Sequence, residues 1–182
     1  MTSPETVFGM SLATYTLAHV VISLVGIASG LVVLFGLVTA KRLEGWTALF
    51  LATTVATSVT GYMFPVHKLM PSHIVGLISL VVLAIAIFAF YKRQLAGGWR
   101  RTYVITAIIG LYLNVFVLIV QLFEKIPALK TLAPTQSEPP FKITQLAVVV
   151  LFVVLGILAT KRFRNEQVST TQQSVNLAPA PR

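Results

Sequence analysis

The sequence has no cysteine, no aspartate and only a few glutamates in 182 residues, so groups for covalent or acid–base chemistry are scarce. Without cysteine there is no disulfide framework, no thiolate nucleophile and no thiolate ligand set for an iron–sulfur cluster. A phosphate-binding glycine loop, a nucleophile elbow and a pair of catalytic carboxylates are missing as well. We therefore expect no independent catalytic activity.

Charge is also scarce: charged residues make up 10% of the chain, against roughly a quarter in soluble domains. Hydrophobic residues make up 56%, and the mean hydropathy is +0.86. So much apolar surface predicts a protein that uses the lipid bilayer as part of its solvent. The formal net charge of +9 does not indicate nucleic-acid binding, because the basic residues lie in short connectors between apolar runs.

Five apolar runs are each close to the ~20 residues that a helix needs to cross the hydrocarbon. They cover residues 17–40, 46–64, 73–91, 102–123 and 143–160. Strand-like alternation is missing, and backbone amides in lipid must be satisfied within the segment, so helices are expected. The predicted fold is all-α: a polytopic antiparallel bundle of five transmembrane helices over 17–163, after a short leader at 1–16. The polar tail at 164–182 is expected to be disordered.

The distribution of lysine and arginine predicts the orientation. An odd number of crossings places the connectors around Lys41, Arg93 and Lys161 on one side, and that side holds ten of the 14 basic residues. The positive-inside rule makes this side cytoplasmic, with the N-terminus outside and the C-terminus inside.

Polar residues within the runs fall on narrow helical faces. In the fourth run these are Tyr103, Thr106, Gly110, Asn114, Gln121 and Glu124; in the first, Tyr15, His19, Ser23, Gly26 and Gly30; in the second, Thr53, Thr57 and Thr60. Such faces should turn away from lipid. The glycines and threonines are typical of helix packing. Asn114 is costly at mid-membrane, and either bonds a neighbouring helix or touches a ligand or water.

The predicted topology brings several polar side chains to one level at the outer end. They are His19, His67, His73, Gln121, Glu124 and Gln145. Imidazole and carboxylate suit transition metals, and the thioether of Met70 suits cuprous copper. A haem needs two imidazoles, or a His and a Met, and His19 with His73 is the favoured pair. A quinone would need only hydrogen-bonding side chains beside apolar walls. The alternative is that these histidines are exposed to water at the membrane surface and only anchor helix ends.

Three strings resemble a group of small bacterial inner-membrane proteins without an established function. They are "GYMFPVHKLMPSHIVG", "LYLNVFVLIVQ" and "LAPTQSEPPF", and the likeness runs from about His19 to Phe163. The resemblance implies a bacterial inner-membrane location and no reaction. A looser likeness to small membrane b-type cytochromes implies haem between histidines of antiparallel helices, and allows one haem only, near the outer surface.

Three function classes follow. The preferred hypothesis is an electron-transfer protein that binds one haem b or a transition metal. The residues that would bind haem or a polar ligand are His19, His73, Gln121, Asn114 and Gln145. Those that would bind a metal are His19, His67, Met70, His73 and Glu124. Electrons would pass to quinone or a periplasmic redox partner. The second is a transporter or channel component, although no charged residue lies mid-membrane to couple to ions. The third is a homo-oligomer or a subunit of a larger membrane complex.

Overall fold

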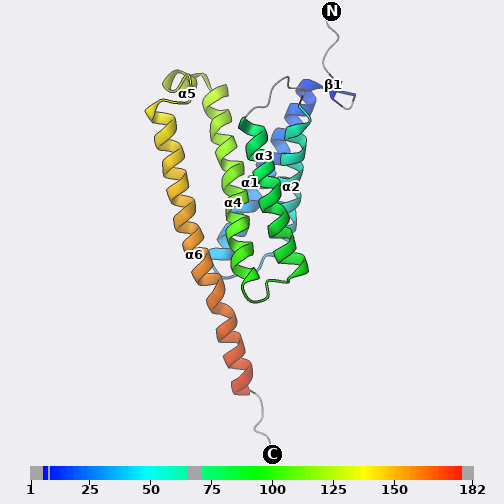
Figure 1. Ribbon diagram of the computed structural model, residues 1–182, viewed down its shortest axis with the longest axis vertical. Helices are drawn as coiled ribbons and strands as arrows, with labels where there is room; N and C mark the ends of the chain where they lie inside the picture. The colour runs from blue at the N-terminus through cyan, green and yellow to red at the C-terminus, as the bar shows by residue number, and fades with distance from the viewer. Residues whose placement is uncertain (1–5, 8, 65–70, 178–182) are drawn as a thin grey trace, which may run out of the picture.

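The computed structural model describes residues 6–7, 9–64 and 71–177 (Figure 1). A short antiparallel hairpin of two two-residue strands pairs Thr6 with Ser11 and Val7 with Met10. The elements in chain order are β1 (Thr6–Val7), β2 (Met10–Ser11), α1 (Leu12–Val38), α2 (Glu44–Tyr62), α3 (Pro71–Ile87), the π-helix η1 (Phe88–Lys92), α4 (Trp99–Lys125), α5 (Pro127–Leu132) and α6 (Pro139–Leu177). The described chain is therefore mostly helical, as predicted.

The long helices α1, α2, α3, α4 and α6 form a bundle in which sequence neighbours run in opposite directions (Figure 1). Helix α4 packs against α1, α3 and α6, while α2 lies between α1 and α3. We call the end that carries α5 and the β1–β2 hairpin the α5 end. The opposite end carries the connectors around Lys41 and Arg93, and we call it the basic end.

Four helical segments are long and apolar enough to cross a membrane: Leu12–Val38, His73–Lys92, Trp99–Lys125 and Pro139–Phe163. This length and composition fit a multi-pass membrane protein. The 19-residue α2 is not among these four, because its threonines, serine and glycines lower its hydropathy. Even so, α2 takes the place in the bundle that the run at 46–64 predicts.

The helix ends differ from the predicted ones in two places. Helix α1 starts before Leu17, because Ser11 caps it: the Ser11 hydroxyl accepts a hydrogen bond from the backbone N–H of Thr14. Helix α6 continues through Leu177, whereas the sequence predicted disorder from residue 164. No proline or glycine lies between 164 and 177 to interrupt the helix, so the hydrogen-bonded spiral continues past the apolar span.

An apolar layer closes the centre of the bundle. Its large side chains are Phe50, Leu83 and Leu111, each no more than 1% exposed. Gly30 of α1 faces this layer, and a Cβ built on Gly30 would lie 2.6 Å from Leu111 Cδ1 and 2.8 Å from Phe50 Cδ2. The absence of a side chain at Gly30 is therefore what lets α1 approach α2 and α4 so closely.

The connector between α4 and α6 folds back on the α5 end. Ala133 is 1% exposed and packs in a small apolar cluster with Ile119 and Phe123. Glu138 precedes α6, and its carboxylate accepts hydrogen bonds from Thr135 Oγ1 at 2.8 Å and from the backbone N–H of Ser137 at 3.0 Å. Ala133 therefore packs the connector against α4, and the Glu138 hydrogen bonds hold the turn that precedes α6.

We predict that Gly30→Ala destabilises the protein by about 1–3 kcal/mol, because the new methyl group must displace Leu111 and Phe50 in a packed layer. Gly45→Ala is the matched control, since a Cβ at Gly45 meets nothing within 4 Å. Thermal unfolding of the two variants in detergent checks the prediction. Equal midpoints for both variants would show that α1 does not depend on a glycine at this contact.

Candidate functional site: a polar seam between α1, α2 and α4

Polar side chains of three helices gather between α1, α2 and α4 in the half of the bundle nearest the α5 end. We call this group the polar seam, and its members are Tyr15, His19 and Gly26 of α1, Thr53, Thr54, Thr57 and Thr60 of α2, and Asn114 of α4. The threonine stripe at 53, 57 and 60 was predicted from helical spacing. Its inward orientation follows from the cost of leaving hydroxyls in hydrocarbon.

The outer end of the seam is a hydrogen-bonded group around Thr60. The Tyr15 hydroxyl donates to the backbone carbonyl of Thr60 at 2.8 Å. His19 Nδ1 lies 2.7 Å from Thr60 Oγ1. The ring of Phe64 closes one side of the His19 imidazole, with ring centroids 5.3 Å apart in an edge-to-face arrangement. His19 is therefore held in a fixed orientation at the mouth of the seam.

The hydrogen bonds of Thr60 assign the tautomer of His19. The Thr60 hydroxyl has one proton, which it donates to the backbone carbonyl of Ala56 at 2.7 Å. With that proton donated to Ala56, we infer that Thr60 Oγ1 accepts from His19 and that neutral His19 carries its proton on Nδ1. The other ring nitrogen, Nε2, keeps a lone pair that can accept a proton or bind a metal.

The middle of the seam is crowded with polar atoms around Gly26. A Cβ built on Gly26 would lie 3.2 Å from each of Asn114 Nδ2, Thr53 Oγ1 and Thr54 Oγ1. Thr53 Oγ1 donates back to the carbonyl of Leu49 at 2.7 Å. Thr54 Oγ1, Thr57 Oγ1 and Asn114 Nδ2, by contrast, are buried and have no hydrogen-bond partner among the described residues. Three unpaired polar atoms thus lie in one short stretch of the seam.

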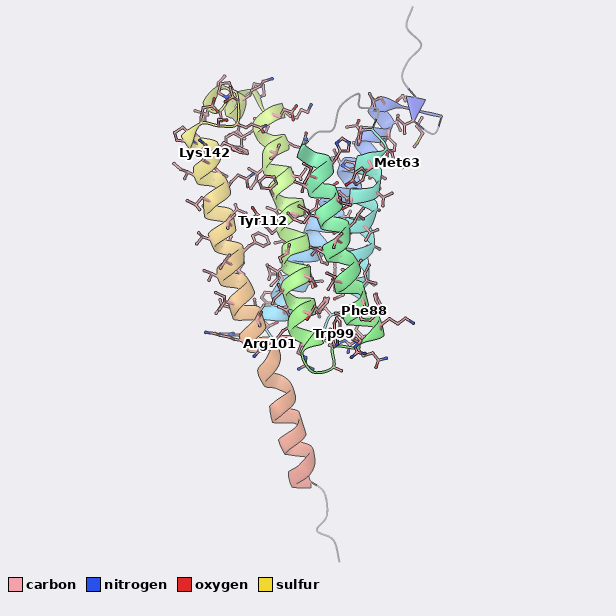
Figure 2. All side chains as sticks on the ribbon, viewed as in Figure 1. Met63, Phe88, Trp99, Arg101, Tyr112 and Lys142 are labelled. Atoms are coloured by element: carbon pink, nitrogen blue, oxygen red, sulfur yellow. The ribbon has the colours of Figure 1, made fainter. Side chains whose placement is uncertain are left out.

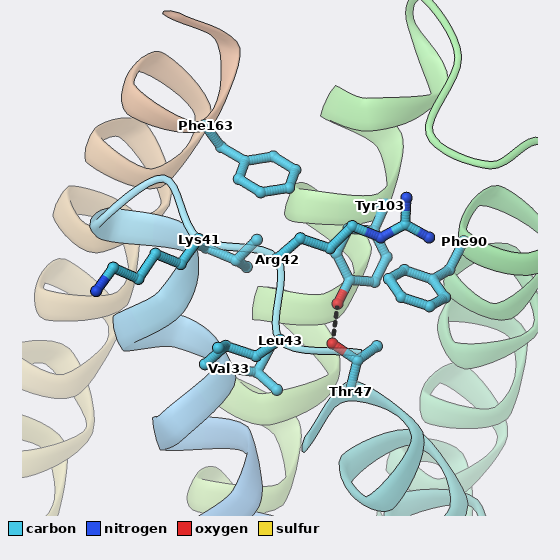
Figure 3. Close-up of a pocket in the computed structure, with 9 residues that line it drawn as sticks. Val33, Lys41, Arg42, Leu43, Thr47, Phe90, Tyr103 and Phe163 are labelled. Atoms are coloured by element: carbon cyan, nitrogen blue, oxygen red, sulfur yellow. Dashed lines mark hydrogen bonds between the residues drawn. The ribbon is translucent and has the colours of Figure 1, made fainter. Parts of the chain in front are cut away.

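The seam ends at the apolar layer of Phe50, Leu83 and Leu111. Beyond it, at the basic end, the hydroxyls of Thr47 and Tyr103 lie 3.1 Å apart (Figure 3). The side chains around this pair leave no room for a water molecule. Arg42 covers the same end, with its guanidinium 4.8 Å from the centre of the Phe90 ring. The structure is therefore closed on the side of the basic end.

His73 belongs to a different side of α2. The Tyr62 hydroxyl donates to the backbone carbonyl of His73, and the two rings are 5.5 Å apart. At ~100° per residue, Tyr62 points roughly opposite to Thr60 and Phe64, which contact His19. Helix α2 therefore separates the side chains of His19 and His73, although both lie near the α5 end.

The other predicted site residues that the structure describes do not lie together, and none of them lies in the polar seam. Gln145 is buried between α6 and α4, where its Nε2 donates to the carbonyl of Phe116 at 3.3 Å, and its Oε1 has no partner among the described residues. Gln121 and Glu124 are exposed, and Glu124 lies 3.9 Å from Lys125. His67 and Met70 lie outside the described residues. Within the described ranges, no three His, Asp or Glu side chains are close enough to hold a metal ion.

Sequence reasoning missed part of the inward face of α2. Thr47, Thr54 and Ser58 are buried, and Ser58 Oγ donates to Ser79 Oγ of α3 at 3.2 Å. These residues are seven and four positions apart, which is one helical face, so the spacing carried the signal. The stripe at 53, 57 and 60 is the neighbouring face of α2, and it leads towards His19.

No protein-family model, curated protein or solved structure matches this chain.

We predict that Thr60→Val destabilises the protein by about 1 kcal/mol, because the N–H of His19 loses its acceptor. The variant also frees His19 to place its proton on either ring nitrogen. Nitrogen NMR of labelled histidine in micelles reports the tautomer directly. Thr16→Val, which removes an exposed back-bonded hydroxyl of α1, should leave the His19 signals unchanged. Unchanged His19 signals in Thr60→Val would contradict the assignment.

Proposed function

We propose that this chain is an integral membrane channel or transporter component that admits water and small polar species into the polar seam. The observation that carries the proposal is the set of three buried, unpaired polar atoms: Thr54 Oγ1, Thr57 Oγ1 and Asn114 Nδ2. Burying such a group without a partner costs roughly 1–3 kcal/mol. Water or a small polar solute supplies partners that the neighbouring helices do not.

The proposed topology has five crossings, with α2 as the fifth span beside the four apolar ones. Helix α2 tolerates its low hydropathy because its threonines face α1, α3 and α4 rather than lipid. The basic end would be cytoplasmic, since it gathers most lysines and arginines of the described connectors. The polar seam would then open towards the outside. The resemblance noted from the sequence supports a bacterial inner membrane.

The chemistry of the seam suits neutral species and protons rather than coupled ions. Among the described residues, the seam has no Asp, Glu, Lys or Arg that would bind an ion at mid-membrane. His19 at the mouth can accept a proton on Nε2, and hydroxyls of the threonine stripe continue inward from it. The layer of Phe50, Leu83 and Leu111 would serve as the gate that keeps the path closed at rest.

The test is flux in proteoliposomes, measured with an internal pH dye for protons and by light scattering after osmotic shock for water and small neutral solutes. Asn114→Leu replaces the amide by an apolar side chain of similar size and should reduce flux about tenfold or more. Thr57→Val, which removes one hydroxyl at nearly constant shape, should give a smaller loss.

Thr144→Val is the matched control, because it removes a helical hydroxyl of α6 that bonds only its own backbone. Its flux should equal that of the unaltered protein. Flux no greater than in empty liposomes for every species would sink the channel proposal. So would equal flux in the Asn114→Leu variant, provided that it remains folded by thermal unfolding.

A second candidate function is single-haem or metal binding at His19, for electron exchange with quinone or a periplasmic partner. The observation that favours it is the Thr60 contact, because a His that donates one N–H is oriented to ligate through the other nitrogen. Since α2 separates His19 from His73, the second ligand would come from elsewhere. Gln145 and Asn114 also lie away from the His19 ring, on α6 and α4.

A visible spectrum and metal analysis of the purified protein test this candidate. Haem or metal binding predicts a Soret band or stoichiometric metal that disappears in His19→Ala and persists in His73→Ala. Loss in both variants would restore the pairing expected from the sequence. A colourless, metal-free protein with intact flux would remove the second candidate.

The third class, assembly through glycine and threonine faces, has less support. Gly26 and Gly30 pack inside the monomer against Asn114 and Leu111, so they do not offer an outward surface for a partner.

A further inference from the structure

A groove of about 540 Å³ runs between α4 and α6 on the outside of the bundle. The walls are apolar, with Ile105, Ile109 and Tyr112 on α4 and Phe152, Val153 and Ile157 on α6. Gly156 forms part of the floor, where a missing side chain leaves space beside Ile108. In a membrane protein, such a groove faces lipid.

The length of the groove matches one leaflet. Along α6 the lining runs from Val149 to Lys161, which at a rise of 1.5 Å per residue is about 18 Å. That is slightly more than half of the ~30 Å hydrocarbon thickness. The groove thus begins near the middle of the membrane and ends at the surface of the basic end, as an acyl chain of a single leaflet does.

The basic end of the groove is positively charged. Lys161 lines it directly. Arg101 precedes Ile105 by four residues and so lies on the same face of α4, at the basic end in Figure 2. The ion pairs between described side chains join Arg42 to Glu44 and Lys125 to Glu124, so neither Arg101 nor Lys161 has a carboxylate partner among them. Arg101 and Lys161 are therefore available to bind an anionic group at the basic end of the groove.

Arg100 is a third cation at the same end of α4, although it does not line the groove. Arg100 reaches from α4 to α6, where its Nη1 lies 3.5 Å from the carbonyl of Phe163 and its guanidinium lies 5.5 Å from the centre of the Phe163 ring. Its Nε is buried without a partner among the described residues. Arg100 therefore links α4 to α6 at the basic end.

The geometry points to an anionic phospholipid as the occupant, with one acyl chain in the groove and its phosphate at Arg101 and Lys161. Guanidinium and ammonium groups between transmembrane helices are the usual partners of lipid phosphates. A quinone would not need the cations, because its headgroup is neutral. A helix about 10 Å wide and 18 Å long occupies roughly 1,400 Å³, so a second copy of the chain cannot enter the groove whole.

The experiment is native mass spectrometry of the detergent-purified full chain, with phosphatidylglycerol or phosphatidylcholine of identical acyl chains added. We expect phosphatidylglycerol to be retained at least about fivefold better, in keeping with the contribution of one basic residue near a charged lipid. Arg101→Gln with Lys161→Gln should abolish that preference and leave weak, equal retention of both lipids. Lys92→Gln with Arg93→Gln, at the same end but on η1 and its following connector, should retain it.

A second variant tests the groove itself. A Cβ at Gly156 would lie 3.8 Å from the nearest atoms of Ile108, which is ordinary contact, so Gly156→Leu fits the backbone and fills the groove. Retention of both lipids should fall, and thermal unfolding should show a folded protein. Equal retention of the two lipids by the unaltered chain, undiminished retention in Gly156→Leu, or a lipid-free dimer would each overturn the assignment.

Discussion

The close approach of α1 to its neighbours at Gly26 and Gly30 determines what the centre of the bundle contains. The two positions are about one turn apart, so they present the same face of α1 to α2 and α4. At Gly26 the nearest atoms are polar and come from Thr53, Thr54 and Asn114, whereas at Gly30 they are apolar and come from Phe50 and Leu111. A single helical turn therefore separates a polar site from an apolar barrier.

The difference between these two levels explains why the polar atoms are not all paired. Helices in a bilayer associate through packing and interhelical hydrogen bonds, without a hydrophobic driving force between them. The tight contact at Gly30 fixes the distance between α1 and α4, and this distance also holds one turn away at Gly26. Asn114 Nδ2 and Thr54 Oγ1 lie at similar depth in the bundle, and neither has a hydrogen-bond partner among the described residues. Close packing of the apolar layer therefore leaves polar groups at the level of Gly26 without hydrogen bonds.

The helical content, the approximate spans and the inward direction of the Thr53, Thr57 and Thr60 stripe could be predicted from the sequence, because each depends on local composition or on a period of 3.6 residues. The early start of α1 depended on one cap, Ser11, which is a weaker signal. The sequence did not predict the continuation of α6 to Leu177, because the segment is polar, although it has no helix breaker.

The candidate site was harder to predict, because sequence gives the depth of a residue in a bundle but not its direction around the bundle axis. His19 and His73 are both near the α5 end, but each contacts a different side of α2, through Thr60 and Tyr62 respectively. Gln145 has a comparable depth and bonds Phe116 in the contact between α6 and α4. Which helices are neighbours is decided by long-range packing, and no spacing within one helix encodes it.

The same geometry would limit how the path proposed above could open. Gly30 on α1 and Gly110 on α4 bring backbone close to the side chains of the apolar layer, and a Cβ on Gly110 would lie 3.2 Å from Leu83 Cδ2. The backbones therefore have little room to move inward, so opening of the proposed path would depend on rotation of Phe50, Leu83 or Leu111. Helix α3, which contributes Leu83, ends in the π-helical turn Phe88–Lys92, where the hydrogen-bond register changes. A shift of that register would rotate α3, and with it Leu83 relative to Gly110, without separating α1 from α4, so the proposed gating would require the least rearrangement if it took place in α3.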